Sequence, residues 1–117
     1  MKTALSISQL ETEFTNPAFV LKIQHQIAKD FGTSGIDFSS EFNLTPLSYL
    51  ELIHSVGEKL TELMTIGKSQ TLQLLYRIDI PQQDFLALTT DTEFIQKMSV
   101  LIIRREAYKI YLRSVYK

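Results

Sequence analysis

Hydrophobic residues recur at three- and four-residue steps along most of the chain, which is the spacing of one face of an α-helix. The first run follows Asn16 and Pro17, and this pair is typical of a helix start. Asn can cap free backbone amides, and Pro at the first helical position sacrifices no hydrogen bond. Gly32 follows as a left-handed stop. The pattern predicts a helix over about residues 17–30, with one apolar face made of Val20, Ile23, Ile27 and Phe31.

Thr45-Pro46 repeats this start signal, and an apolar stripe follows it as far as Gly67. We therefore expect a second helix between these points. The next segment, Ser69–Ile78, is apolar on nearly every side, which predicts a short helix at the centre of the fold.

Two further helix starts follow. Asp79 with Gln82 has the spacing of a cap and predicts a short helix at about residues 80–88. Thr90 with Glu93 has the sequence of a capping box and predicts the longest helix, at about residues 91–115. Its broad apolar face consists of Phe94, Met98, Leu101, Ile102, Tyr108, Leu112 and Val115.

Two segments do not show a clear helical pattern. Ile36, Phe38 and Phe42 alternate with polar residues, which predicts a short extended stretch at residues 36–42. Residues 1–14 are compatible with either a helix or an extended arm. The sequence predicts one all-α domain over residues 1–117, a bundle of four to five helices whose short connections favour antiparallel neighbours. The alternative is an α+β fold in which residues 36–42 pair with Leu5–Ile7 as a two-stranded ribbon.

Composition narrows the class of protein. The 117 residues are 44% hydrophobic and 21% charged, as in an ordinary globular domain. The chain contains no cysteine, which excludes disulfides and thiolate chemistry and suits a reducing compartment. No apolar run approaches the ~20 residues of a membrane span, and the first residues lack a signal-peptide core. We expect a cytoplasmic protein without membrane contact.

Charge is unevenly distributed. The chain has a net charge of −1, yet residues 104–117 sum to +4 and the rest to −5. Arg105, Lys109 and Arg113 recur every four residues, with Tyr108 and Tyr111 between them. Basic and aromatic side chains in this arrangement can bind single-stranded nucleic acid. They can equally be cations that complement a helix C-terminus, beside tyrosines at the edge of the core.

The most distinctive tetrad is Tyr76-Arg77-Ile78-Asp79. Arg77 lies inside an apolar run, so its guanidinium must find an acceptor or reach water. The tetrad is thus either a structural ion pair at the junction of two helices or a contact for an anion or a partner.

The sequence gives little support for a phosphate-binding loop, a metal site or a pair of catalytic carboxylates. Gly67-Lys68-Ser69 resembles the end of a phosphate-binding loop, but the motif needs a glycine where Glu62 stands. His25 and His54 lack metal-ligand spacing. Glu58 and Glu62 lie one turn apart, as on a solvated helix face. We expect no catalytic residues, no metal and no cofactor.

The last helix supplies the functional hypothesis. At ~1.5 Å per residue it would be ~36 Å long, whereas a globule of this size has a radius of gyration of about 13 Å. Its final turns should extend beyond the bundle and expose Tyr108, Tyr111, Leu112, Val115 and Tyr116. We therefore expect a non-enzymatic protein–protein interaction or self-associating module, a dimer being the simplest form. Nucleic-acid binding through the basic final helix is the alternative.

Two segments, Leu74–Ile80 and Leu101–Lys109 with Arg113 beyond, resemble a family of small uncharacterised bacterial proteins. That family shows a Tyr-Arg-Ile-Asp turn followed by a long helix of this pattern. The resemblance covers roughly residues 70–117. It implies a bacterial cytosolic protein and brings no known activity.

Overall fold

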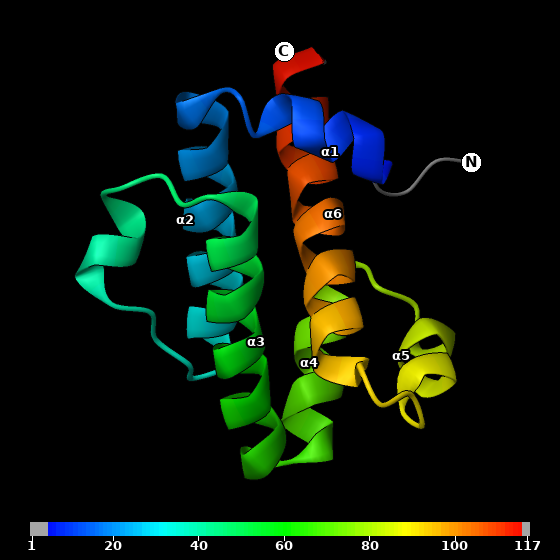
Figure 1. The fold of residues 1–117 in the computed structure, drawn as a ribbon. Helices are drawn as coiled ribbons and strands as arrows, with labels where there is room; N and C mark the ends of the chain where they lie inside the picture. Colours follow the sequence, from blue (N-terminus) through cyan, green and yellow to red (C-terminus); the bar gives the residue numbers. More distant parts are fainter. Residues whose placement is uncertain (1–4, 116–117) are drawn as a thin grey trace.

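Helix α6 (Phe94–Val115) lies at the centre of the molecule and contacts every other α-helix (Figure 1). The computed structural model describes residues 5–115. Within them the other elements are α1 (Ile7–Glu13), α2 (Pro17–Thr33), the 3₁₀-helix η1 (Ser40–Asn43), α3 (Tyr49–Ile66), α4 (Lys68–Ile78) and α5 (Gln82–Leu88). The all-α prediction is confirmed. The count exceeds the expected four to five because residues 7–13, which the pattern left open, form α1.

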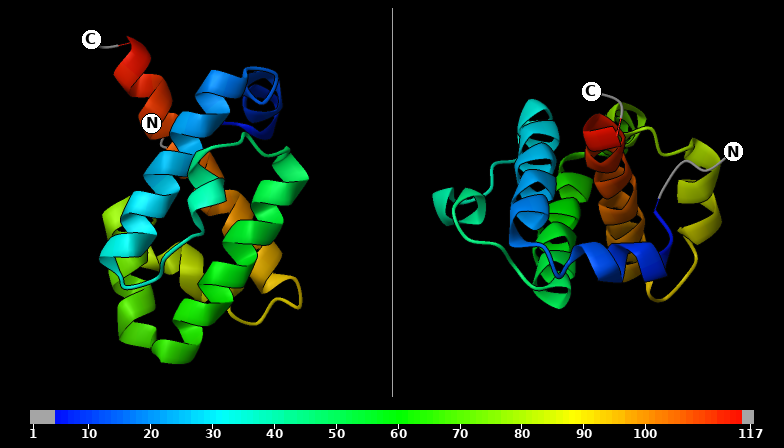
Figure 2. Two further views of the ribbon diagram at one scale, coloured as in Figure 1. Left: turned by 90° about the vertical axis from the view of Figure 1, so that its left-hand side faces the viewer. Right: turned by 90° about the horizontal axis from the view of Figure 1, so that it is seen from above.

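Helices α2 and α3 run in the same direction, and α6 runs against both (Figures 1 and 2). Antiparallel neighbours were expected where connections are short, and the connection between α2 and α3 is long. Residues 34–48, which we call the crossover segment, carry the chain back along the length of α2 before α3 begins. An extended chain covers about 3.3 Å per residue, so this segment can easily span the helix.

The predicted extended stretch at residues 36–42 lies within the crossover segment. Ile36 and Phe42 are buried, and Phe38 stacks on Phe42 with ring centroids 4.1 Å apart. The alternation thus correctly places these side chains against the core. The segment ends in η1, and the described residues contain no strand, so the two-stranded ribbon is wrong. Leu5 instead bonds through its backbone N–H to the carbonyl of Arg104 on α6, at 3.3 Å.

Three helices begin where serine or asparagine caps them, and the first is α1, which begins after Ser6. The Asn16 side chain accepts from the Phe19 N–H at 3.3 Å, which confirms the predicted start of α2. Helix α3 begins at Tyr49 under a reciprocal capping box of Ser48 and Glu51, and the start predicted at Thr45-Pro46 is wrong. The Thr45 carbonyl accepts from the buried Gln24 amide at 3.0 Å and is therefore not available to a helix.

The predicted starts of α5 and α6 are also wrong, because the aspartate near each one has a role other than the expected one. Asp79 ends α4 in the left-handed conformation, with φ 72°, and α5 begins after Pro81. Aspartate tolerates this conformation better than most residues. Before α6, Asp91 rather than Thr90 makes the side-chain hydrogen bonds. Its carboxylate accepts from the Glu93 N–H at 2.7 Å and from Lys97 Nζ at 2.6 Å.

Two glycines fall near predicted helix stops. Gly67 follows the last residue of α3, as expected. Gly32 still belongs to α2, and the positive φ of 88° occurs at Gly35 in the turn beyond it.

The final helix extends beyond its neighbours less than its length suggested. The molecule measures 35 × 34 × 27 Å, and α6 has 22 residues, so at ~1.5 Å per residue it spans about the whole molecule. The last turn alone projects (Figure 2, left), and Val115 is exposed there. Tyr108 and Leu112 are only partly exposed. Tyr116, which was expected to be exposed, lies outside the described residues.

Candidate functional site

The basic stripe of the last helix is largely turned toward the protein. The Arg105 guanidinium pairs with the Asp79 carboxylate at 3.2 Å, and its side chain is only 15% exposed. Lys109 Nζ lies 3.1 Å from Glu106, 3.6 Å from Asp30, and donates to the Arg77 carbonyl at 3.2 Å. These two cations therefore have intramolecular partners and join α6 to α2 and to the end of α4.

The Tyr76–Asp79 tetrad lies at that α4 end, and its members are directed differently. Arg77 Nη1 donates to Ser34 Oγ at 3.1 Å, so the ion pair at this junction is made by Arg105 and Asp79. Tyr76 is 84% exposed. The tetrad supplies one interhelical pair and one isolated exposed aromatic ring.

Tyr108 and Tyr111 of α6 stack against one another, and Tyr111 is also exposed to solvent. The rings of Tyr108 and Tyr111 stack at a centroid distance of 6.4 Å, and the Arg105 guanidinium lies 5.6 Å from the Tyr108 ring. Tyr111 keeps 38% of its surface exposed.

A buried acidic pair lies beneath this surface. Glu106 on α6 is 0% exposed and Asp30 on α2 is 5% exposed. Burial raises the pKa of Glu106 to about 9, and the hydrogen bond and negative charge of Asp30 add to this against the opposing charge of Lys109. A carboxyl with this pKa keeps its proton at neutral pH, which lowers the repulsion between Glu106 and the Asp30 carboxylate. Among the described residues, Lys109 Nζ is the cation that lies beside this carboxyl, 3.1 Å from Glu106 Oε1.

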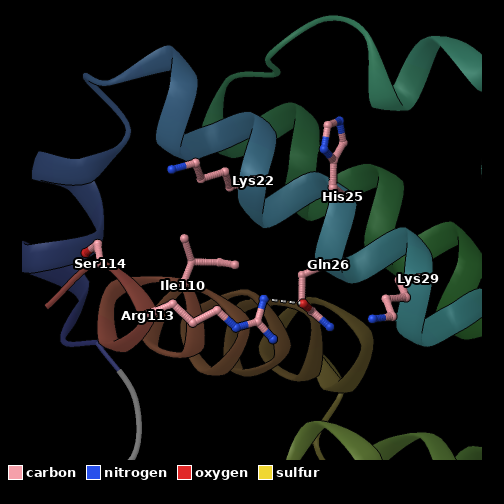
Figure 3. A pocket seen from close by; sticks show the side chains of 7 residues that line it. All are labelled: Lys22, His25, Gln26, Lys29, Ile110, Arg113 and Ser114. Carbon is pink, nitrogen blue, oxygen red and sulfur yellow. Dashed lines mark hydrogen bonds between the residues drawn. The ribbon is translucent and has the colours of Figure 1, made fainter. Parts of the chain in front are cut away.

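A pocket of about 380 Å³ opens between α2 and α6, and we call it the α2–α6 pocket (Figure 3). Its lining is basic: it contains three cations and a histidine but no carboxylate. Asp30 and Glu106 do not line it, so no acid–base pair is formed within it. The lining residues are Lys22, His25, Gln26, Lys29, Ile110, Arg113 and Ser114.

A second, shallower depression of about 920 Å³ runs between α3 and the start of α6, and we call it the α3–α6 groove. Its apolar lining includes Ile53, Phe94, Ile95 and Leu50, the last of which is 76% exposed. The groove also contains three carboxylates and neither lysine nor arginine; the carboxylates are Glu58, Glu62 and Glu93.

Sequence reasoning put Arg113 among the candidates but missed its neighbours in the α2–α6 pocket. Lys22 and Lys29 are seven residues apart and thus on one face of α2, a signal that was present in the sequence. The sequence pointed to the groove only through the pair Glu58 and Glu62, which had been interpreted as part of a solvated helix face. His54 bonds to Glu58 at 2.6 Å on this face, and both are exposed.

Within residues 5–115, no group of histidine and carboxylate side chains could hold a metal ion. No helix in the same range is both long and apolar enough to cross a membrane. No family model, curated protein or solved structure matches the chain. The resemblance of residues 70–117 to small bacterial proteins therefore stays a prediction.

Proposed function

We propose that the protein is a non-enzymatic protein-interaction module, and that the α3–α6 groove binds an amphipathic helix of a partner. The observation that carries this proposal is an apolar surface left open between two packed helices, with Leu50 76% exposed at its edge. A groove between two packed helices can accept a third helix through apolar anchors at every third or fourth residue. The absence of cysteine supports a cytoplasmic setting.

Charge selects the kind of helix. Glu58 and Glu62 are 64% and 54% exposed, and Glu93 is exposed beside them. Opposite charge at the rim of an interface accelerates association and excludes wrong partners. A basic amphipathic helix therefore fits the groove, whereas an acidic one of the same apolar pattern does not.

The structure gives less support to the other two interpretations. Nucleic-acid binding required Arg105 and Lys109 to be available, and both are paired with carboxylates of other helices. Self-association required broad apolar exposure along α6, and only Tyr111 and Val115 are exposed large apolar residues on that helix within the described part of the chain. A second copy is therefore a less suitable occupant than a basic helix.

The test is a binding titration with two designed helical peptides that share their leucine positions and differ in flanking charge, lysine or glutamate. The intact protein should bind the basic peptide in the micromolar range, about −8 kcal/mol, and the acidic peptide far more weakly. Leu50→Ser should weaken binding of the basic peptide at least about tenfold, because a buried apolar anchor is lost. Fluorescence anisotropy of the labelled peptides measures the affinity of each peptide for the wild type and for Leu50→Ser.

Leu44→Ser is the matched control, since Leu44 is 71% exposed but lies on the crossover segment. It should leave the affinity unchanged, and both surface variants should fold normally. Equal binding of the two peptides would refute the charge argument. Concentration-dependent dimerisation that Leu50→Ser abolishes, seen by analytical ultracentrifugation, would show a second copy in the groove and overturn the proposal of a distinct partner.

A further inference from the structure

The α2–α6 pocket places three cationic side chains around one small space without a carboxylate in the lining. Figure 3 shows Lys22 and Lys29 extending from α2 on the side of the pocket, with the Arg113 guanidinium reaching from α6 between them. None of the three takes part in an ion pair with any residue from 5 to 115. Cations gathered in one concavity raise the local concentration of anions.

The guanidinium is held in place rather than free. Arg113 Nη1 donates to Gln26 Oε1 at 2.8 Å, and the Gln26 amide in turn donates to Asp30 at 3.2 Å. Gln26 is 92% buried, with 8% of its surface exposed. A binding group oriented by a buried neighbour loses little conformational freedom when a ligand arrives.

The negative charge nearest to the pocket is already compensated. Asp30 lies behind Gln26, where it accepts from Gln26 and pairs with Lys109 at 3.6 Å. Glu106 is protonated and therefore adds no charge. The lining thus contributes three positive charges, and the ring of His25, which also lines the pocket, bonds to the Asn43 carbonyl at 2.7 Å.

We propose that this pocket binds the phosphate group of a small phosphorylated molecule through Lys22, Lys29 and Arg113. A phosphate dianion matches several cations better than a single carboxylate does, and arginine binds phosphate oxygens in a bidentate fork. Ile110 supplies an apolar floor for the organic part. A volume of about 380 Å³ suits a small molecule. The proposal is independent of the α3–α6 groove.

The test is a titration of the intact protein with inorganic phosphate and with glycerol phosphate, followed by NMR of backbone amides and the Arg113 side chain. Saturable shifts should cluster at α2 and the end of α6, with a dissociation constant on the order of 1 mM. Lys29→Gln and Arg113→Gln should each weaken binding about tenfold, the usual effect of one charge-assisted hydrogen bond. Arg113→Lys should retain part of the affinity, because it keeps the charge and loses the fork.

Lys68→Gln is the control, because it removes one positive charge from the exposed start of α4. It should leave phosphate binding unchanged, as should Leu50→Ser in the groove. The proposed site would be refuted if Lys68→Gln lost as much affinity as Lys29→Gln or Arg113→Gln. It would also be refuted by shifts that rise linearly, without saturation, up to about 20 mM phosphate. If the protein sediments with phosphatidic acid vesicles but binds neither inorganic phosphate nor glycerol phosphate saturably, the phosphate it recognises belongs to a lipid. That result would reject a small soluble ligand.

Discussion

The free energy of unfolding is expected to fall as the pH rises from about 5 to about 9. The folded protein keeps a proton on Glu106, whose pKa is about 9, while the unfolded chain releases that proton near the ordinary value of 4.5. Over this window the folded state binds one more proton than the unfolded state, so stability is highest at the acidic end. The slope is at most about 1.4 kcal/mol per pH unit for one proton.

The decline in stability between about pH 5 and about pH 9 is assigned to Glu106, because the other groups with shifted pKa values titrate outside this pH range. The pKa of Glu51 is lowered by its hydrogen bonds with Ser48, and that of Asp91 by Lys97 and Glu93. Any stability that these carboxylates contribute is lost only as the pH falls below their ordinary range near 4. Burial raises the pKa of Tyr49 above 10, so its effect appears only at higher pH.

Urea denaturation at several pH values measures the effect, and Glu106→Gln is the decisive variant. A neutral amide of the same size has no proton to lose, so its stability should be nearly constant between about pH 5 and about pH 9. In Asp30→Asn the decline should end at a lower pH than in the wild type, because the substitution removes the negative charge that helps to raise the Glu106 pKa. Parallel pH profiles for the wild type and Glu106→Gln would contradict the assignment.

Helical periodicity was sufficient to predict the fold class, because an apolar face must be buried whatever covers it. Val20, Ile23, Ile27 and Phe31 are all buried on α2, as their spacing indicated. Helix ends were less predictable, since the same residue types can start and stop a helix. Asp79 has the sequence context of a cap but ends α4 in a left-handed turn, where its exposed carboxylate pairs with Arg105 of α6.

The site was predicted less well than the fold for a related reason. Periodicity puts Arg105 and Lys109 on one face of the last helix, but it does not say what lies opposite that face. Their partners Asp30 and Asp79 come from α2 and the α4 end, far away in the sequence. No local pattern in the sequence shows that Glu106 is fully buried beside a second carboxyl.

The second large effect is expected at Gln24, which holds the crossover segment onto α2. Gln24 is 0% exposed, and its amide donates to the carbonyls of Phe42 at 2.6 Å and Thr45 at 3.0 Å. Its oxygen accepts from the Leu47 N–H at 2.8 Å. One side chain therefore supplies the hydrogen bonds that an irregular segment cannot make for itself, which allows α3 to start beside α2 in the same direction.

Gln24→Leu should lower the free energy of unfolding by about 3 kcal/mol or more, because leucine leaves three backbone groups without a partner at a cost of about 1–3 kcal/mol each when buried. Urea denaturation gives the total, and amide hydrogen exchange should show the loss of protection concentrated at residues 42–47. Gln83→Leu, on the exposed face of α5, is the matched control and should change stability by less than about 0.5 kcal/mol. If Gln24→Leu is as stable as Gln83→Leu, the crossover segment is held by its apolar contacts at Ile36 and Phe42 instead. A large loss in Gln24→Leu alone means that a single buried amide holds the crossover segment, and so the start of α3, against α2.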